Sequence, residues 1–149
     1  MRTRTWWGWV FLFPTLAHAA LGLSPSAPAS AGPQTTMPFS GASASYSVQT
    51  SQDATGCVIR EYVAANGIVF AVSWKGKRLP DLKSLLAGYF PAYLQAQRQN
   101  GKGLNVLAEQ VGNLVIHSYG RMGSFQGMAY DKTLLPAGVT PAQLKQGAL

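Results

Sequence analysis

The strongest constraint on the fold is the segment REYVAANGIVFAVSWKG, residues 60–76. Two runs rich in β-branched and aromatic residues flank Asn66-Gly67, a pair favoured where both central turn residues need positive φ. The sequence therefore predicts a β-hairpin. With a two-residue turn, one face of this hairpin would carry the pairs Ala65–Ile68, Val63–Phe70, Glu61–Val72 and Ile59–Trp74.

Glu61 is the anomaly on that face, because the other side chains there are apolar or small. A buried carboxylate must be paired or have a raised pKa, and either condition can mark a site. A structural ion pair, or a bulge that turns Glu61 outward, would explain it equally well. Glu61 is therefore a candidate site residue with no assigned role.

Further elements follow on both sides of the hairpin. Residues 44–50 alternate like an outer strand, and the apolar residues of 82–94 recur with helical spacing. We expect this helix to begin near Asp81, to end before Gly101 and to pack on the face of Phe70 and Trp74. Pro91 lies inside it and predicts a kink, or two short helices that meet near Phe90.

The rest of the chain predicts a second hairpin, another strand and a last helix. Gly112-Asn113 separates two strand-like runs, residues 124–130 read as a strand, and Thr140 to Gln143 match a capping box. Strands joined by tight turns are antiparallel. The predicted class is α+β: a single antiparallel sheet of about five to six strands, with one kinked amphipathic helix on one face and a short C-terminal helix.

The N-terminal region carries the pattern of an export signal. Arg2 and Arg4 precede an apolar run that ends at Ala17-His18-Ala19, so we expect residues 1–19 to be a cleaved signal peptide. Residues 20–44, rich in Ser, Pro and Ala and free of charge, are predicted to be a disordered tether, and residues 45–149 a single domain. Without Arg2 and Arg4, the 12 Lys+Arg become 10, which against 5 Asp+Glu leaves a net charge of +5.

Several blocks, REYV, NGIVFAVSW, LPDLKSLLAGYF, VIHSYGRMGSFQGMAY and LLPAGVTP, stand in an order that resembles a known family. This is an uncharacterised domain-of-unknown-function family of small exported proteins from Gram-negative proteobacteria. The resemblance covers about Ser45 to Gln143. It implies an exported single-domain protein and assigns no catalytic residue. From the signal pattern we expect a periplasmic or secreted location.

Few residues could carry catalysis or bind a metal. Outside the leader there are one histidine and one cysteine, with no CxxC and no pair of metal ligands at helical spacing, so we expect no metal and no cofactor. The phosphate-loop and nucleophile-elbow motifs are absent from the sequence. Cys57 with His117 is the one nucleophile–base pair that the composition offers cysteine chemistry, and a buried, inert thiol is the simpler interpretation.

Two polar groups are candidate ligand surfaces. His117, Tyr119 and Arg121 alternate along a strand, so they should share one face of the sheet. Lys75, Lys77 and Arg78 precede the predicted helix, where basic side chains and free N–H groups favour an anion. Each group could equally be a solvated surface.

The leading hypothesis is a non-enzymatic binding or interaction domain of the cell envelope. Its expected partner is an anionic envelope polymer or another envelope protein, and no continuous basic stripe suggests a nucleic acid. The alternative is a small envelope hydrolase that uses His117 with Glu61 or Tyr119. A third hypothesis is assembly by strand addition, through an uncovered edge strand at residues 44–50.

Overall fold

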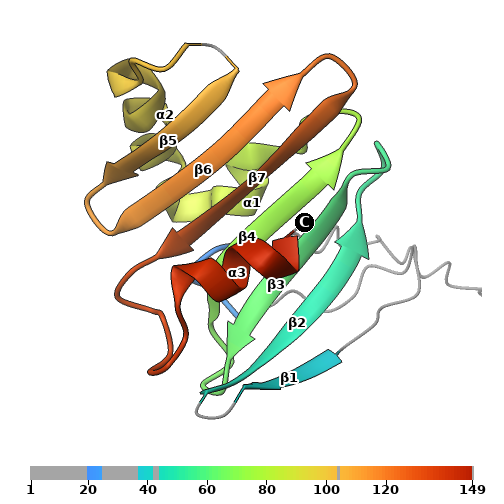
Figure 1. The fold of residues 1–149 in the computed structure, drawn as a ribbon, viewed down its shortest axis with the longest axis vertical. Helices are drawn as coiled ribbons and strands as arrows, with labels where there is room; N and C mark the ends of the chain where they lie inside the picture. The colour runs from blue at the N-terminus through green and yellow to red at the C-terminus, as the bar shows by residue number, and fades with distance from the viewer. Residues whose placement is uncertain (1–19, 25–36, 42–43, 104, 149) are drawn as a thin grey trace, which may run out of the picture.

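The computed structural model describes residues 20–24, 37–41, 44–103 and 105–148. Its strands form one antiparallel sheet in the order β1-β2-β3-β4-β7-β6-β5 (Figure 1). The strands are β1 (Met37–Gly41), β2 (Ala44–Gln52), β3 (Val58–Ala64), β4 (Val69–Gly76), β5 (Val106–Val111), β6 (Leu114–Arg121) and β7 (Ser124–Asp131).

Helices cover both faces of this sheet. Helix α1 (Leu82–Leu86), the 3₁₀ turn η1 (Ala87–Tyr89) and α2 (Phe90–Gln99) lie behind the sheet in Figure 1, and α3 (Pro141–Ala148) lies in front of it. We call these sides the helix face and the α3 face. The predicted α+β class is confirmed: β2 to β7 are the six strands expected, and β1 adds a seventh at the edge.

The β3–β4 hairpin forms as predicted, but with a longer turn. Ala64 N–H donates to the Ile68 carbonyl, Gly67 N–H donates to the Ala64 carbonyl, and Gly67 has φ of 78°. This is a three-residue loop that ends in a left-handed glycine, and it shifts the register by one residue. Val63 therefore pairs with Val69 and not with Phe70.

A β-bulge in β4 then restores the predicted register. Phe70 is the extra residue, because Tyr62 pairs with Ala71 while Val63 pairs with Val69. Below the bulge the pairs Glu61–Val72 and Ile59–Trp74 are those that were predicted. The expectation that Phe70 faces the long helix is wrong, since the bulge moves Phe70 to the α3 face, where it packs with Tyr46 and Tyr62.

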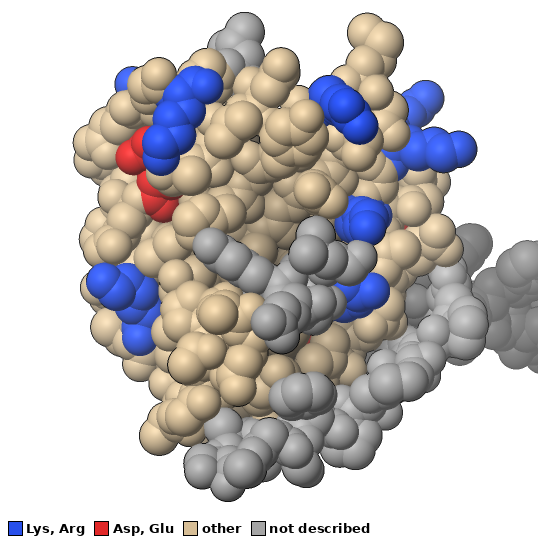
Figure 2. All heavy atoms as spheres, in the orientation of Figure 1, with Lys and Arg blue, Asp and Glu red and all other residues tan. Residues whose placement is uncertain are grey.

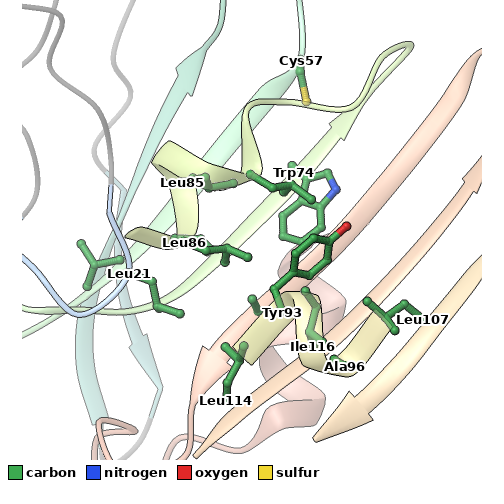
Figure 3. Close-up of a cluster of buried hydrophobic side chains, with 14 of the residues drawn as sticks. Leu21, Cys57, Trp74, Leu85, Leu86, Tyr93, Ala96, Leu107, Leu114 and Ile116 are labelled. Carbon is green, nitrogen blue, oxygen red and sulfur yellow. The ribbon is translucent and has the colours of Figure 1, made fainter. Parts of the chain in front are cut away.

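The sheet therefore separates two apolar clusters. Figure 3 shows the helix-face cluster, in which side chains of α1 and α2 meet Trp74 and Ile116. The α3-face cluster contains Val139 and Leu144, both buried. Its other buried members are Tyr62, Phe70, Ala71, Val115, Met128 and Tyr130.

The predicted break in the long helix is present, but it comes before the proline. Helix α1 ends at Leu86, its C-cap residue Ala87 has φ of 43°, and α2 begins at Phe90 with Pro91 in its first turn. Proline costs no hydrogen bond at that position, because the first N–H groups of a helix have no partner within it. Pro91 thus starts the second helix and does not kink a continuous one.

The remaining turns and caps agree with the sequence. Val111 pairs with Leu114 around Gly112-Asn113, and Arg121 pairs with Ser124 around Met122-Gly123. The Gln143 side chain accepts a hydrogen bond from Thr140 N–H at 2.8 Å, which is half of the predicted capping box.

The segment expected to be a tether differs from that expectation in two places. Residues 20–24 pack against the domain, where Leu21 is 1% exposed, and residues 37–41 form β1. The predicted signal peptide, residues 1–19, and the part of the tether at 25–36 lie outside the described residues.

The structure also tests the edge strand that was expected at residues 44–50. Residues 44–50 belong to β2, which lies between β1 and β3, so this segment is not the uncovered edge that strand addition would need. At the opposite side, the Asn100 and Lys102 side chains donate to the carbonyls of Val106 and Ala108 on β5, at 2.8 and 2.7 Å.

No helix in the described part of the chain is long and apolar enough to span a membrane.

Candidate functional site

Strand pairing places a set of polar side chains on the α3 face. His117 pairs with Met128, a buried member of the α3-face cluster, so His117, Tyr119 and Arg121 share that face by alternation. Tyr119 and Arg121 are exposed, and His117 is half-buried. The structure thus brings together the three residues of the predicted row.

Three residues of neighbouring strands, Arg60, Lys75 and Gln126, extend this row. Ser73 and Lys75 alternate with Val72 and Trp74 of the helix-face cluster, so they lie on the α3 face. Arg60 pairs with Ser73, and Lys75 pairs with Gln126. We call the resulting set the polar sheet surface: Arg60, Lys75, His117, Tyr119, Arg121 and Gln126.

Register arranges this surface in two adjacent rows across the sheet. One row runs from Arg60 through Ser73 and Met128 to His117, and the next contains Lys75, Gln126 and Tyr119. From β3 to β6 there are three strand intervals, which corresponds to about 14 Å. The surface is therefore wider than a single small ion.

The carboxylates of the chain lie elsewhere. Glu61, Glu109 and Asp131 are on the helix face, because their cross-strand partners Val72, Ile116 and Leu114 belong to its cluster. The other two acids are in loops: Asp53 accepts hydrogen bonds from the backbone of its own turn, and Asp81 caps α1. No Asp or Glu of the described residues therefore stands on the α3 face of a strand.

Figure 2 shows this side of the molecule. Lys and Arg side chains appear over the right and upper right of the view, around β3, β4 and the β6–β7 turn, whereas the prominent acidic atoms are at the upper left near β5. The acidic residue of β5 is Glu109, which forms an ion pair with Lys102 at 3.7 Å. The charge on this side is thus predominantly positive away from the β5 edge.

Glu61 is buried, as the hairpin pattern predicted, and it is separated from His117 by the sheet itself. Glu61 is 5% exposed, and its Oε1 atom has no hydrogen-bond partner among the described residues. Burial raises the pKa of this carboxyl to about 7 from an ordinary value of 4.5. Because Glu61 lies on the helix face and His117 on the α3 face, they cannot act together on one substrate, which removes the Glu61 version of the hydrolase hypothesis. In the other version, His117 and Tyr119 do share the α3 face.

Cys57 is a buried thiol at the start of β3. It is fully buried in the helix-face cluster and packs against Gly76, at which a Cβ atom would lie 2.8 Å from the Cys57 backbone. Burial is the main cause that raises the pKa of the thiol, which disfavours the reactive thiolate. The strands β4 and β7 separate β3 from β6, so the Cys57–His117 pair does not form.

The basic loop before α1 has a competing acceptor. Lys77 and Arg78 are exposed, as the sequence predicted. The Asp81 side chain already accepts from the N–H groups of Lys83 and Ser84, at 3.0 and 3.3 Å. An anion bound by Lys77 and Arg78 would therefore depend on the side chains of this loop and not on the helix N-terminus.

Arg60 was missed as a candidate, although the sequence contains a signal for it. The predicted hairpin register puts Glu61 with Val72 in the core, so its neighbour Arg60 must point to the opposite face, beside Ser73.

No group of three His, Cys, Asp or Glu side chains that could hold a metal occurs among the residues described.

Comparison with known proteins identifies the family without assigning an activity. No curated protein and no solved structure matches the chain. A family model, described as Protein of unknown function (DUF2844), matches residues 17–144, which include every described helix and strand except the end of α3. The chain belongs to this family of proteins of unknown function.

Proposed function

We propose that this protein is an exported, non-enzymatic binding domain of the cell envelope, and that its polar sheet surface binds an anionic polymer. One observation carries the proposal: the strand register places Arg60, Lys75 and Arg121 on one face of the sheet. Cations gathered on one face attract a polyanion and increase its association rate.

The shape of the surface favours a polymer over a small anion. Its cations stand on three different strands, spread from β3 to β6, so successive charges of an extended chain would suit them better than one phosphate. The exposed Tyr119 ring and the Gln126 amide add an apolar face and a hydrogen-bonding group, as binding of an acidic polysaccharide would require.

Export is the second part of the proposal and has separate support. A basic start, a short apolar run and Ala17-His18-Ala19 form the pattern of a cleaved signal. The family resemblance implies the same for a Gram-negative proteobacterium, and the signal pattern favours a periplasmic or secreted destination. An envelope location would also place the domain among acidic polymers.

Binding to dextran sulfate, with neutral dextran as the uncharged comparison, tests the ligand chemistry. The triple variant Arg60→Gln, Lys75→Gln and Arg121→Gln should lose at least about tenfold in affinity, since three charges leave the binding surface. Raising the salt concentration should weaken wild-type binding, because exposed charges are screened. Fluorescence anisotropy of labelled polymer measures both effects.

The matched control removes the same net charge from other surfaces. Lys83→Gln, Arg98→Gln and Lys132→Gln lie on α1, on α2 and beyond the end of β7. This control triple should change the affinity by less than about threefold, the residual effect of net charge alone. Equal losses in the two triple variants, or equal binding of neutral dextran, would reject the polar sheet surface as the binding site.

A further inference from the structure

Residues 20–24 are built into the core of the domain. Leu21 is 1% exposed and belongs to the helix-face cluster, and Figure 3 shows its side chain on the same side of the sheet as Leu86. Ala20 is also buried, whereas Leu23 is 56% exposed. One large side chain of this segment is thus a core residue, and a chemically identical one two positions later is not.

Backbone hydrogen bonds attach the segment to two elements. Leu21 N–H donates to the Leu85 carbonyl of α1, and Gly22 N–H donates to the Val69 carbonyl of β4, at 3.1 and 2.8 Å. In return, Val69 N–H donates to the Leu23 carbonyl at 3.0 Å. The segment therefore satisfies the Val69 peptide groups at the beginning of β4, beyond the last pairing of β4 with β7 at Ala71–Tyr130.

Gly22 lies so close to the Tyr89 ring that its position has no room for a side chain. Its φ is 81°, and a Cβ atom added there would lie 2.9 Å from a ring carbon of Tyr89. The Tyr89 hydroxyl in turn donates to Asp131 at 2.6 Å. A side chain at position 22 would push Tyr89 away from Asp131, so the segment, the 3₁₀ turn and the end of β7 form one packed unit.

This packed segment begins immediately after the triplet expected to direct signal-peptide cleavage. We propose that hydrolysis of the Ala19–Ala20 bond produces a short docking strap, residues 20–24, whose packing completes the folded domain. Water cleaves the peptide bond, which leaves a carboxylate on Ala19 and an α-amino group on Ala20. The family match starts at residue 17 and so includes both the triplet and the strap.

Cleavage must come before docking in this scheme. A signal peptidase binds the residues around the scissile bond in an accessible, unfolded form, and the docked strap has a buried Leu21 and an occupied Leu21 N–H. Docking then protects the new N-terminus. A cut after Ser24 would remove Leu21 from the core, so the cleavage position decides the stability of the product.

The inference depends on the export proposal for the cleavage, and it is independent of the proposed ligand. The full chain is expressed in a Gram-negative host, and the protein from the envelope fraction is analysed by intact mass. The expected mass corresponds to a chain that starts at Ala20. Hydrogen exchange should show the Leu21 and Gly22 amides slowed by at least about tenfold relative to an unstructured peptide.

Two leucine variants test the strap. Leu21→Ala should lower the urea midpoint and abolish the protection of the Gly22 amide, while Leu23→Ala should leave both unchanged. Leu21→Met, which preserves the volume, should retain most of the wild-type midpoint and keeps the test valid if Leu21→Ala does not fold. Equal behaviour of Leu21→Ala and Leu23→Ala, or a mature chain that starts beyond Leu21, would overturn the strap.

The outcomes separate this inference from the proposed function. A chain that remains uncleaved would reject the cleavage step and with it the proposed strap, but dextran sulfate binding would be unaffected. Loss of dextran sulfate binding with a correct Ala20 terminus would reject the ligand proposal alone.

Discussion

At the scale of single residues, Glu61 stands out because it is an ionisable group in a buried environment. Its cross-strand neighbours are Gln49 on β2 and Val72 on β4, and neither carries a charge. Neither neighbour offsets the loss of hydration with an opposite charge, so burial favours the neutral form of the carboxyl. Such a group links the stability of the fold to pH.

The pH dependence has a definite sign. Between pH 4.5 and about 7 the folded protein keeps a proton on Glu61 that the unfolded chain has released. The free energy of unfolding should therefore be highest, as far as this group is concerned, below pH 4.5, and should fall by about 3 kcal/mol as the pH rises through 7. Glu61→Gln, which is uncharged throughout, should flatten that dependence.

Urea denaturation at pH 5 and pH 8 measures this effect. The difference between the two pH values should be smaller in Glu61→Gln than in the wild type, and the variant should be the more stable protein at pH 8. Glu109→Gln is the control, since Glu109 is partly exposed beside Lys102 and should keep the wild-type difference. An unchanged pH dependence in Glu61→Gln would contradict the assignment.

The sequence predicted the burial of Glu61, but it could not predict what surrounds it. The alternation of side chains along the hairpin predicted that Glu61 is in the core, and the alternation along β6 predicted that His117 and Arg121 share one face of the sheet. Whether Glu61 and His117 share a face depends on the strand order and on the parity of the register across four strands. Those are tertiary properties, and a single sequence contains no local signal for them.

At the scale of elements, Trp74 on β4 and Gly127 on β7 are packed so tightly that position 127 has no room for a side chain. They are cross-strand partners, and a Cβ atom on Gly127 would overlap the Trp74 indole and approach the His117 carbonyl oxygen to 2.9 Å. The missing side chain leaves room for the Trp74 indole beside β7. Glycine weakens most strands, but here it creates the space for a large core residue.

Gly127→Ala should therefore destabilise the protein by about 1–3 kcal/mol, because a methyl group in a filled core forces neighbours out of position. The control is Gly88→Ala in the 3₁₀ turn, where an added Cβ meets nothing within 4 Å and φ is not positive, so stability should be unchanged or slightly higher. Urea denaturation followed by Trp74 fluorescence compares the two. Comparable midpoints would show that the sheet accommodates the methyl group.

Elements with strong local signals were predictable, and elements that depend on packing were not. Asn66-Gly67, Gly112-Asn113 and the capping box at Thr140 each predicted an element that is present. The bulge at Phe70 was not predictable, since it compensates for a turn one residue longer than expected. The strap was missed because Leu21 lies in a Ser/Pro/Ala-rich stretch whose composition indicates disorder.

At the scale of the whole molecule, the two apolar clusters belong to one cooperative unit. They lie on opposite faces of the same sheet, and β4 contributes to both, through Val72 and Trp74 on one face and through Phe70 and Ala71 on the other. Loss of either cluster removes a layer that the sheet needs. We expect the domain to unfold in a single transition.

Truncation of one buried leucine on each face tests this expectation. Leu86→Ala on the helix face and Leu144→Ala in α3 should each lower the free energy of unfolding by about 2–5 kcal/mol. Each variant should still unfold in a single transition, at a lower urea midpoint. Trp74 fluorescence reports the helix face and far-UV circular dichroism reports the sheet. Coincident curves for both probes are expected, and two separable transitions in either variant would show that the layers unfold independently.

The bonded carbonyls at the β5 edge have a consequence for how copies of this protein can associate. A fibre built by continuing one sheet from molecule to molecule needs two edges on every copy that can accept a new strand. At β5 the carbonyls of Val106 and Ala108 are already taken by Asn100 and Lys102. A strand added at this edge would have to displace both side chains, so we expect edge-to-edge pairing to use the opposite edge and to end at two copies.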